Sequence, residues 1–129
     1  MALDAGQRLA AIDPAGMAAR LVSAADDRDG SELLVNAIYQ SKDARAAELA
    51  CAAREKLGRS AASMACMARA RTSDPVDPTI LAQVGVAASG GSELSINFRT
   101  QAAWIFLSRS GQADRAIKAM TEASLKATP

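Results

Sequence analysis

Apolar residues recur along this chain at intervals of three and four, the spacing that places them on one face of an α-helix. Asp13 followed by Pro14 supplies an N-cap and a first helical residue, and Met17 and Leu21 follow at helical spacing. These signals predict a helix over 14–25. A shorter leading helix is predicted before it from its own apolar residues, Leu3, Leu9, Ala10 and Ile12.

Two further helices are predicted in the next part of the chain. The polar run 26–30 interrupts the apolar pattern, and Asp29 and Glu32 have the spacing of a capping box that opens a helix. Asp43 is placed to cap the following helix, which the pattern extends to Gly58. That helix has a narrow apolar stripe built mainly of alanine: Ala46, Leu49, Ala50, Ala53 and Leu57.

A fourth helix is predicted between Ser60, a suitable N-cap, and the segment 72–75, which ends in a proline that stops it. Its expected apolar face contains Met64, Met67 and Ala68.

Three more helices are predicted toward the end of the sequence. Asp77 and Pro78 repeat the opening signal of the first helix, and the glycine pair 90–91 closes the helix they begin. Ser92 or Ser95 begins a sixth helix, whose broad apolar face predicts that it is the central helix of the core. That face contains Leu94, Phe98, Ala102, Trp104, Ile105, Phe106 and Leu107. The seventh helix is predicted after Gly111 from its inward-facing residues, Ala113, Ala116, Ile117, Met120 and Ala123.

Strict alternation of apolar and polar residues, the pattern of a half-buried strand, occurs nowhere in the chain. The fold class is therefore predicted to be all-α, with six or seven short antiparallel helices in a compact bundle or a short solenoid-like stack of helical hairpins. A length of 129 residues suits one hydrophobic core, so residues 1–129 are predicted to form a single helical domain.

Composition supports helices and indicates a thin core. Half of the residues are hydrophobic, but almost half of these are alanine, the residue with the highest helix propensity. Few large apolar side chains remain to fill an interior. Because association would bury apolar surface that a thin core leaves exposed, the composition also favours a homodimer.

The charge balance argues against nucleic acid as a partner. Basic and acidic residues number 15 and 14, spread along the chain, for a net charge of +1. A nucleic-acid surface needs clustered basic residues and stacking aromatics, and only Tyr39, Phe98, Trp104 and Phe106 are aromatic. The longest apolar run, 102–107, is too short to cross a membrane, and the first residues do not resemble a signal peptide. We expect a cytoplasmic protein that binds neither membrane nor nucleic acid.

The chain contains no histidine, which excludes His-based catalytic triads, His metal sites and imidazole acid–base chemistry. We expect no metal and no cofactor. Glu48 and Glu55 are seven residues apart and so are expected on one helix face, where ion pairing with nearby arginines explains them. An enzyme that uses carboxylates, arginine or a cysteine remains open, without an assembled catalytic constellation.

Cys51 and Cys66 are too few for a disulfide framework and are not spaced as paired metal ligands. They are predicted to be small buried residues. Because they lie almost equally far from Gly58, where a turn between antiparallel helices is predicted, they can also face each other. This leaves a redox hypothesis open.

Two stretches resemble tetratricopeptide helical hairpins, in which two helices flank a turn glycine, small residues let them pack and a proline closes the unit. Trp104 departs from that pattern, because it stands where the family has a small residue. The spacing between the two units also departs from the repeat of about 34 residues. The residues that match in Thr100–Pro129 are Gly111, Ala116, Ala123 and Pro129, and those in Ala47–Pro75 are Gly58, Ser63, Ala70 and Pro75.

The resemblance implies protein interaction of an adaptor or chaperone-like kind. A vaguer likeness, carried by residues 36–57, is to small Ala-rich helical proteins of unknown function in bacteria, and it implies no activity. We therefore predict a non-catalytic protein–protein interaction module. The alternative is a helical regulator that binds a small apolar ligand between its helices. The candidate interaction or pocket residues are Trp104, an aromatic anchor, and the adaptable side chains Met64 and Met67.

Overall fold

The computed structural model describes residues 8–73, 76–90 and 94–109, and these residues contain helices, turns and no strand. The all-α prediction is therefore confirmed for this part of the chain. Residues 8–12 are helical, and the helices that follow are α2 (Pro14–Ser23), α3 (Arg28–Ser41), α4 (Ala44–Ala52), α5 (Arg59–Thr72), α6 (Pro78–Ala88) and α7 (Ile96–Arg109), with a 3₁₀ turn, η1 (Arg54–Lys56), between α4 and α5. Within the described ranges, no helix is both long and apolar enough to cross a membrane.

Three of the predicted N-caps are confirmed by their hydrogen bonds. The carboxylate of Asp13 accepts a bond from the backbone N–H of residue 16 at 3.0 Å, and that of Asp43 accepts one from residue 46 at 2.8 Å. Asp77 accepts one from residue 79 at 2.7 Å. Each carboxylate satisfies one of the amides that a helix start leaves without an intrahelical partner, so local sequence chemistry sets these three starts.

The starts of α3 and α5 differ from the prediction, and two of the residues expected to cap them contact each other instead. α3 begins at Arg28 after Asp27, so the expected capping box of Asp29 and Glu32 is wrong. α5 begins at Arg59, so Ser60 lies inside the helix instead of capping it. The Ser60 hydroxyl donates a hydrogen bond of 2.7 Å to the Glu32 carboxylate. The two side chains expected to cap their own helices therefore join α3 to α5 instead.

α4 ends at Ala52, six residues before the predicted end at Gly58. The N–H of Ala53 bonds to the carbonyls of residues 49 and 50, and the chain then tightens into η1. The Arg54 guanidinium donates a 2.8 Å hydrogen bond to the Cys51 carbonyl, one of the carbonyls that the helix end leaves unpaired. Gly58 is not needed for the turn, because its φ is −65° and an added Cβ would meet no atom within 4 Å.

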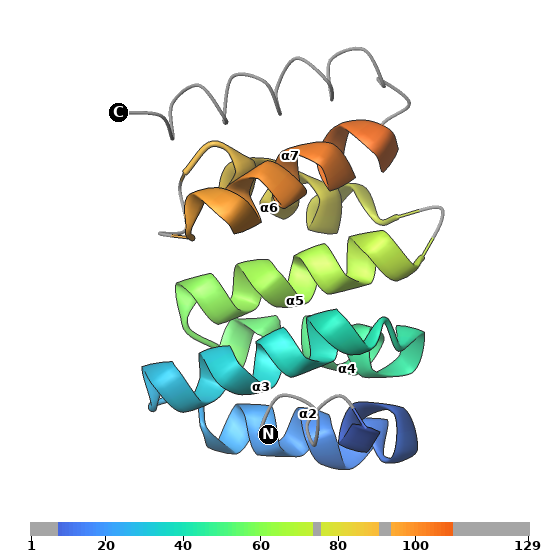
Figure 1. Cartoon of the computed structure of the whole chain (residues 1–129), viewed down its shortest axis with the longest axis vertical. Helices are drawn as coiled ribbons and strands as arrows, with labels where there is room; N and C mark the ends of the chain where they lie inside the picture. Colours follow the sequence, from blue (N-terminus) through green and yellow to red (C-terminus); the bar gives the residue numbers. More distant parts are fainter. Residues whose placement is uncertain (1–7, 74–75, 91–93, 110–129) are drawn as a thin grey trace.

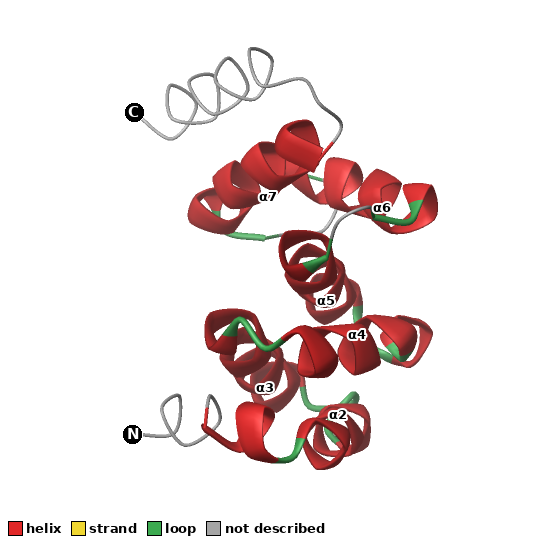
Figure 2. Ribbon diagram, turned by 90° about the vertical axis from the view of Figure 1, so that its right-hand side faces the viewer, coloured by secondary structure: helices red, strands yellow, loops and turns green. Residues whose placement is uncertain are grey.

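The helices are stacked one above another along the longest axis of the molecule (Figure 1). Viewed from the side, α3 and α7 lie on one side of the stack, α4 and α6 on the other, and α5 between them (Figure 2). Extensive contacts among the described elements join helices that are adjacent or next but one in the chain. This is the contact pattern of a stack of helical hairpins.

α5 is the central helix, and the prediction that the helix over Leu94–Leu107 would be central is wrong. Residues 61 to 68 are all buried, as is Ala70, and α5 contacts α3, α4, α6 and α7. Small side chains on every side of α5 let four neighbours approach closely, and a helix that is buried all round shows no single apolar stripe. α7 was favoured because its large residues are conspicuous, but Trp104 on it is 47% exposed.

The core is divided into two neighbouring clusters. The first joins α2, α3, α4 and the start of α5 around Met17, Leu21 and Val35. The second joins α5, α6 and α7 around Met67 and Val84, and it also includes Tyr39 of α3 and two residues of α4. The leading segment contributes Leu9 and Ala10 to the first cluster, whereas Ile12 is 81% exposed. Leu3, Gly111, the predicted seventh helix and most of Thr100–Pro129 lie outside the described residues.

Candidate functional site

A half-open pocket of about 450 Å³ lies where the ends of α3 and α5 meet α7. α3 contributes Tyr39, α5 contributes Arg71, and α7 contributes most of the remaining wall, including Gln101, Trp104 and Arg109. Its volume falls in the range of sites that accept a small molecule or one or two side chains of a bound protein segment. It is the candidate functional site of the described structure.

Arg71 lines the pocket and is held by Tyr39. Its guanidinium carbon lies 3.7 Å from the centroid of the Tyr39 ring, a cation–π contact. Its Nη2 donates a hydrogen bond to the backbone carbonyl of Tyr39, in the last turn of α3. Its Nε is buried and has no hydrogen-bond partner. The guanidinium is therefore held by both the ring and the backbone carbonyl of Tyr39, while its Nε donor is unused.

Tyr39 is held rigidly beneath Arg71. Only 1% of its surface is exposed, its hydroxyl donates a 2.7 Å hydrogen bond to the Gln101 side chain, and its ring meets Phe98 edge-on at 6.0 Å. Burial raises the pKa of the Tyr39 hydroxyl above its usual value, and the positive charge of Arg71 opposes part of that rise. The hydroxyl is thus a neutral hydrogen-bond donor at ordinary pH and a positioning group for Gln101.

Arg109, at the end of α7, also lines the pocket. Its Nε and Nη2 donate to the carbonyls of Ala70 and Arg71, at 2.8 Å and 2.7 Å, in the last turn of α5. No carboxylate among the described residues forms an ion pair with Arg71 or Arg109. The pocket therefore has two positive charges on its wall whose hydrogen-bonded partners are neutral carbonyls.

Trp104 lines the same pocket as these two charges and is 47% exposed. A half-exposed indole next to fixed guanidinium groups can bind an apolar or aromatic group and orient an acidic one. The described residues of the pocket include no acid or thiol that could serve as a nucleophile or general base beside the arginines. The arrangement is therefore suited to binding.

The structure does not bring the three predicted site residues together. Met64 is 4% exposed and borders a different pocket, of about 380 Å³, at the other ends of α3 and α5, near Glu32 and Ser60. Met67 is fully buried in the second core cluster. Only Trp104 lines the larger pocket, so the expected lining of Met64, Met67 and Trp104 is wrong. The two methionines fill the interior, because α5 is enclosed by its neighbours.

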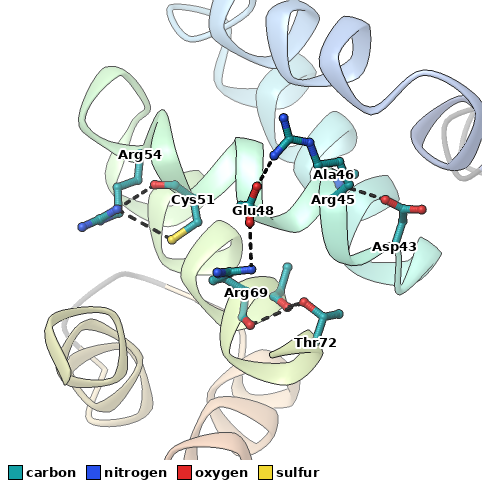
Figure 3. Close-up of polar contacts among 9 residues, drawn as sticks. Asp43, Arg45, Ala46, Glu48, Cys51, Arg54, Arg69 and Thr72 are labelled. Atoms are coloured by element: carbon teal, nitrogen blue, oxygen red, sulfur yellow. Dashed lines mark hydrogen bonds and ion pairs between the residues drawn. The ribbon is translucent and has the colours of Figure 1, made fainter. Parts of the chain in front are cut away.

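A second polar cluster lies along α4 (Figure 3). Glu48 pairs with Arg45 and with Arg69, the latter at 3.5 Å, which confirms the ion pairing expected of Glu48. Glu55 lies in η1, beyond the end of α4, so the expectation that it shares a helix face with Glu48 is wrong. The two carboxylates do not form a catalytic pair.

Cys51 and Cys66 face each other across the contact between α4 and α5. Their sulfur atoms are 4.0 Å apart, and both residues are buried, as predicted. Arg54 lies against Cys51, with its Nη1 3.7 Å from the Cys51 sulfur (Figure 3). In the described parts of the chain, no group of three or more His, Cys, Asp or Glu residues is arranged to hold a metal ion.

The sequence did not indicate Arg71, Gln101 or Arg109 as site residues. Arg71 contacts a residue 32 positions away, Gln101 one 62 positions away, and Arg109 residues 38 and 39 positions away. No local spacing signals such contacts. The one available signal was an arginine in the last helical turn, which favours contact with helix carbonyls without saying which helix.

Compared with known proteins, the chain matches no family model, no curated protein and no solved structure.

Proposed function

We propose that this protein is a non-catalytic protein-interaction module, of an adaptor or chaperone-like kind, and that it binds a segment of a partner protein in the Trp104 pocket. The proposed segment carries a carboxylate next to an apolar or aromatic side chain. The observation that carries the proposal is the half-exposed Trp104 beside two guanidinium groups that lack an acidic partner among the described residues.

The exposure of Trp104 supports binding of the apolar or aromatic side chain of the proposed segment. Tryptophan and arginine are the residues most enriched among those that dominate binding energy at protein interfaces, and both occur at this pocket. A buried tryptophan would act as core, whereas one that is 47% exposed leaves indole surface for a partner to cover.

The two arginines support binding of the carboxylate of the proposed segment. Arg71 is fixed by its Tyr39 contacts and Arg109 by two carbonyls of α5, so neither side chain needs to be ordered when a partner binds. A guanidinium has five N–H donors, and each of these arginines uses only some of them in the bonds described. A carboxylate at the pocket would form charge-assisted hydrogen bonds with the remainder.

A peptide-display selection tests this proposal directly. Random peptides would be selected on the folded full-length protein, and the enriched peptides measured against wild type and two variants. Trp104→Ala should weaken binding by about tenfold or more, as expected for an interface tryptophan. Val86→Ala is the matched control, because Val86 is a similarly exposed apolar residue, at 54%, on α6 outside the pocket.

The enriched peptides should share an acidic group beside an apolar side chain and bind more weakly as salt rises. No enrichment, or peptides that bind Trp104→Ala as well as wild type, would contradict the proposal. Native mass spectrometry of the same samples reports the subunit number. A wild-type dimer that becomes monomeric in Trp104→Ala would show that a second copy of the chain occupies the pocket instead, which is the predicted homodimer.

The alternative function, a regulator that binds a small ligand between helices, is favoured by the pocket volume alone. Its half-open shape and its two arginines suit an anionic aromatic ligand better than the purely apolar one expected from Met64 and Met67. A co-purifying small anion in the native mass spectrum, lost in Trp104→Ala, would support this alternative.

A further inference from the structure

We propose that Cys51 and Cys66 are a modification site, a buried dithiol that peroxide converts reversibly into an intramolecular disulfide. The proposal is independent of the Trp104 pocket, because neither cysteine lines it.

The first argument is the geometry of the pair. The sulfurs are 4.0 Å apart, in contact, and a bond of about 2.05 Å requires them to approach by roughly 2 Å. Small residues of α4 and α5 lie in the same buried cluster as the two cysteines, among them Ala47, Ala68 and Ala70. Small residues permit the close backbone approach that a disulfide between two helices requires.

The second argument is that the two thiols are not equivalent. The sulfur–sulfur hydrogen bond with Cys66, together with the nearby charges of Arg54 and Arg69, lowers the pKa of Cys51 to about 7 against the opposing effect of burial. The hydrogen bond to Cys51, burial and the negative charge of Cys51 raise the pKa of Cys66. Cys51 is thus the thiolate and nucleophile, and Cys66 is the neutral partner.

Cys66 has a second acceptor for its proton. Its sulfur lies 3.2 Å from the Gln83 side-chain oxygen on α6. The neutral Cys66 thiol can donate either to Gln83 or to the Cys51 thiolate, but not to both at once. Once Cys51 has been oxidised, it no longer carries a negative charge. The hydrogen bond to the Cys51 thiolate and the repulsion by its charge then no longer raise the pKa of Cys66. Cys66 then becomes able to react.

The third argument is access. Both sulfurs are buried, but Cys51 is one residue from the end of α4, and the η1 turn that follows contains no buried residue. A helix end followed by an exposed turn opens locally at low cost compared with the centre of a core. Opening of η1 would admit a small oxidant to Cys51 while leaving Cys66, in the middle of α5, enclosed.

The reaction balances in two steps. The Cys51 thiolate attacks one oxygen of hydrogen peroxide, so that an S–O bond forms, the O–O bond breaks and the departing hydroxide takes a proton to become water. The Cys66 sulfur then attacks the Cys51 sulfur, so that the S–S bond forms and the S–O bond breaks. The second hydroxide leaves with the Cys66 proton as water. Two thiols lose two electrons, and one peroxide becomes two waters.

Alkylation and peroxide treatment of the full-length protein test the proposal. At neutral pH, iodoacetamide should modify Cys51 at least tenfold faster than Cys66, because about half of Cys51 and very little of Cys66 is thiolate. The rate at Cys51 should be half-maximal near pH 7. Peroxide should remove two hydrogens from the intact mass, yield a linked Cys51–Cys66 peptide and be reversed by dithiothreitol.

Single substitutions assign the roles. In Cys66→Ser, peroxide should leave a sulfenic acid on Cys51 that dimedone traps. In Cys51→Ser the remaining Cys66 should stay unoxidised even without the Cys51 charge, because its sulfur is enclosed in the middle of α5 and peroxide does not reach it. Arg54→Gln should slow alkylation of Cys51 several-fold, because its guanidinium lies at that sulfur. Lys56→Gln is the matched control, since it removes one positive charge from the same turn. Circular dichroism confirms that each variant is folded.

Two results would overturn the proposal. One is that both thiols are alkylated at the same rate, and only when the protein unfolds. The other is peroxide treatment that leaves both thiols free, or that joins separate chains without a Cys51–Cys66 link.

Discussion

Arg71, in the last turn of α5, lies with its guanidinium carbon 3.7 Å from the ring centroid of Tyr39 and donates a hydrogen bond to the Tyr39 carbonyl in the last turn of α3. Arg109 repeats this relationship one level higher, where it donates to the last-turn carbonyls of α5. An arginine near the end of one helix thus caps the helix two places before it. These contacts align the C-terminal ends of α3, α5 and α7 at one edge of the stack, where the Trp104 pocket lies.

The first prediction concerns the stability that Arg71 supplies. Arg71→Ala removes a charged hydrogen bond and a cation–π contact, so we expect it to lower the free energy of unfolding by about 2 kcal/mol. Arg71→Lys should recover only part of this loss, because an ammonium cannot stack on the ring and reach the carbonyl together. Urea unfolding of the variants measures both effects.

Arg59→Ala is the control for these variants. Arg59 is exposed in the first turn of the same helix, where a positive charge is slightly unfavourable, so its removal should be neutral within about 0.5 kcal/mol. Equal effects of Arg59→Ala and Arg71→Ala would show that Arg71 has no special structural role.

The second prediction is a loss of stability at alkaline pH that is due to Tyr39. The folded state holds the Tyr39 proton more tightly than the unfolded state, whose tyrosine pKa is about 10. The stability that this difference provides is fully present below pH 10 and is lost as pH rises through the folded pKa. Tyr39 is the only tyrosine in the chain, so the phenolate absorbance reports this group alone.

The absorbance titration should therefore have a higher midpoint in the folded protein than in concentrated urea. The free energy of unfolding of Tyr39→Phe should fall less steeply with rising pH than that of wild type, because the variant lacks the titrating hydroxyl. Identical phenolate midpoints in the folded and unfolded protein would be incompatible with a buried Tyr39 hydroxyl.

The features that were predictable from the sequence depend on neighbours a few residues away. The caps at Asp13, Asp43 and Asp77 were predicted because each carboxylate bonds an amide two or three residues along the chain. The mutual approach of Cys51 and Cys66 was also foreseen, since a hairpin places residues on its two arms opposite each other. Such short-range relations can be read without knowing the packing.

The features that were missed depend on packing between distant segments. Ser60 has the chemistry of a cap, but its bond to Glu32, 28 residues away, depends on how α3 meets α5. The central place of α5 was missed because a helix face built of alanine gives the same sequence pattern whether it is buried or exposed. Of the pocket, Trp104 was foreseen by residue type, whereas its arginine neighbours come from contacts across the stack.

The third prediction uses Trp104 as a reporter of binding. It is the only tryptophan in the chain, and its indole is 47% exposed. Iodide should quench its fluorescence readily in the free protein, and a peptide from the display selection should reduce that quenching by covering the ring. Arg71→Lys should weaken the peptide-induced change by altering the geometry of the carboxylate contact. Unchanged quenching at saturating peptide would place the peptide elsewhere on the protein.

The last prediction tests whether alanine at the centre of α5 is required by close packing. Ala65 is fully buried between neighbouring helices, and Ala65→Leu would insert three additional carbon atoms into that contact. We expect a loss of about 1–3 kcal/mol in the free energy of unfolding, because overpacking displaces side chains and backbone. Ala19→Leu, at an exposed position of α2, makes the same chemical change with an expected effect below about 0.5 kcal/mol. If the two variants were equally stable, α5 would have room for larger residues and could not be the tightly enclosed helix on which the alignment of the pocket depends.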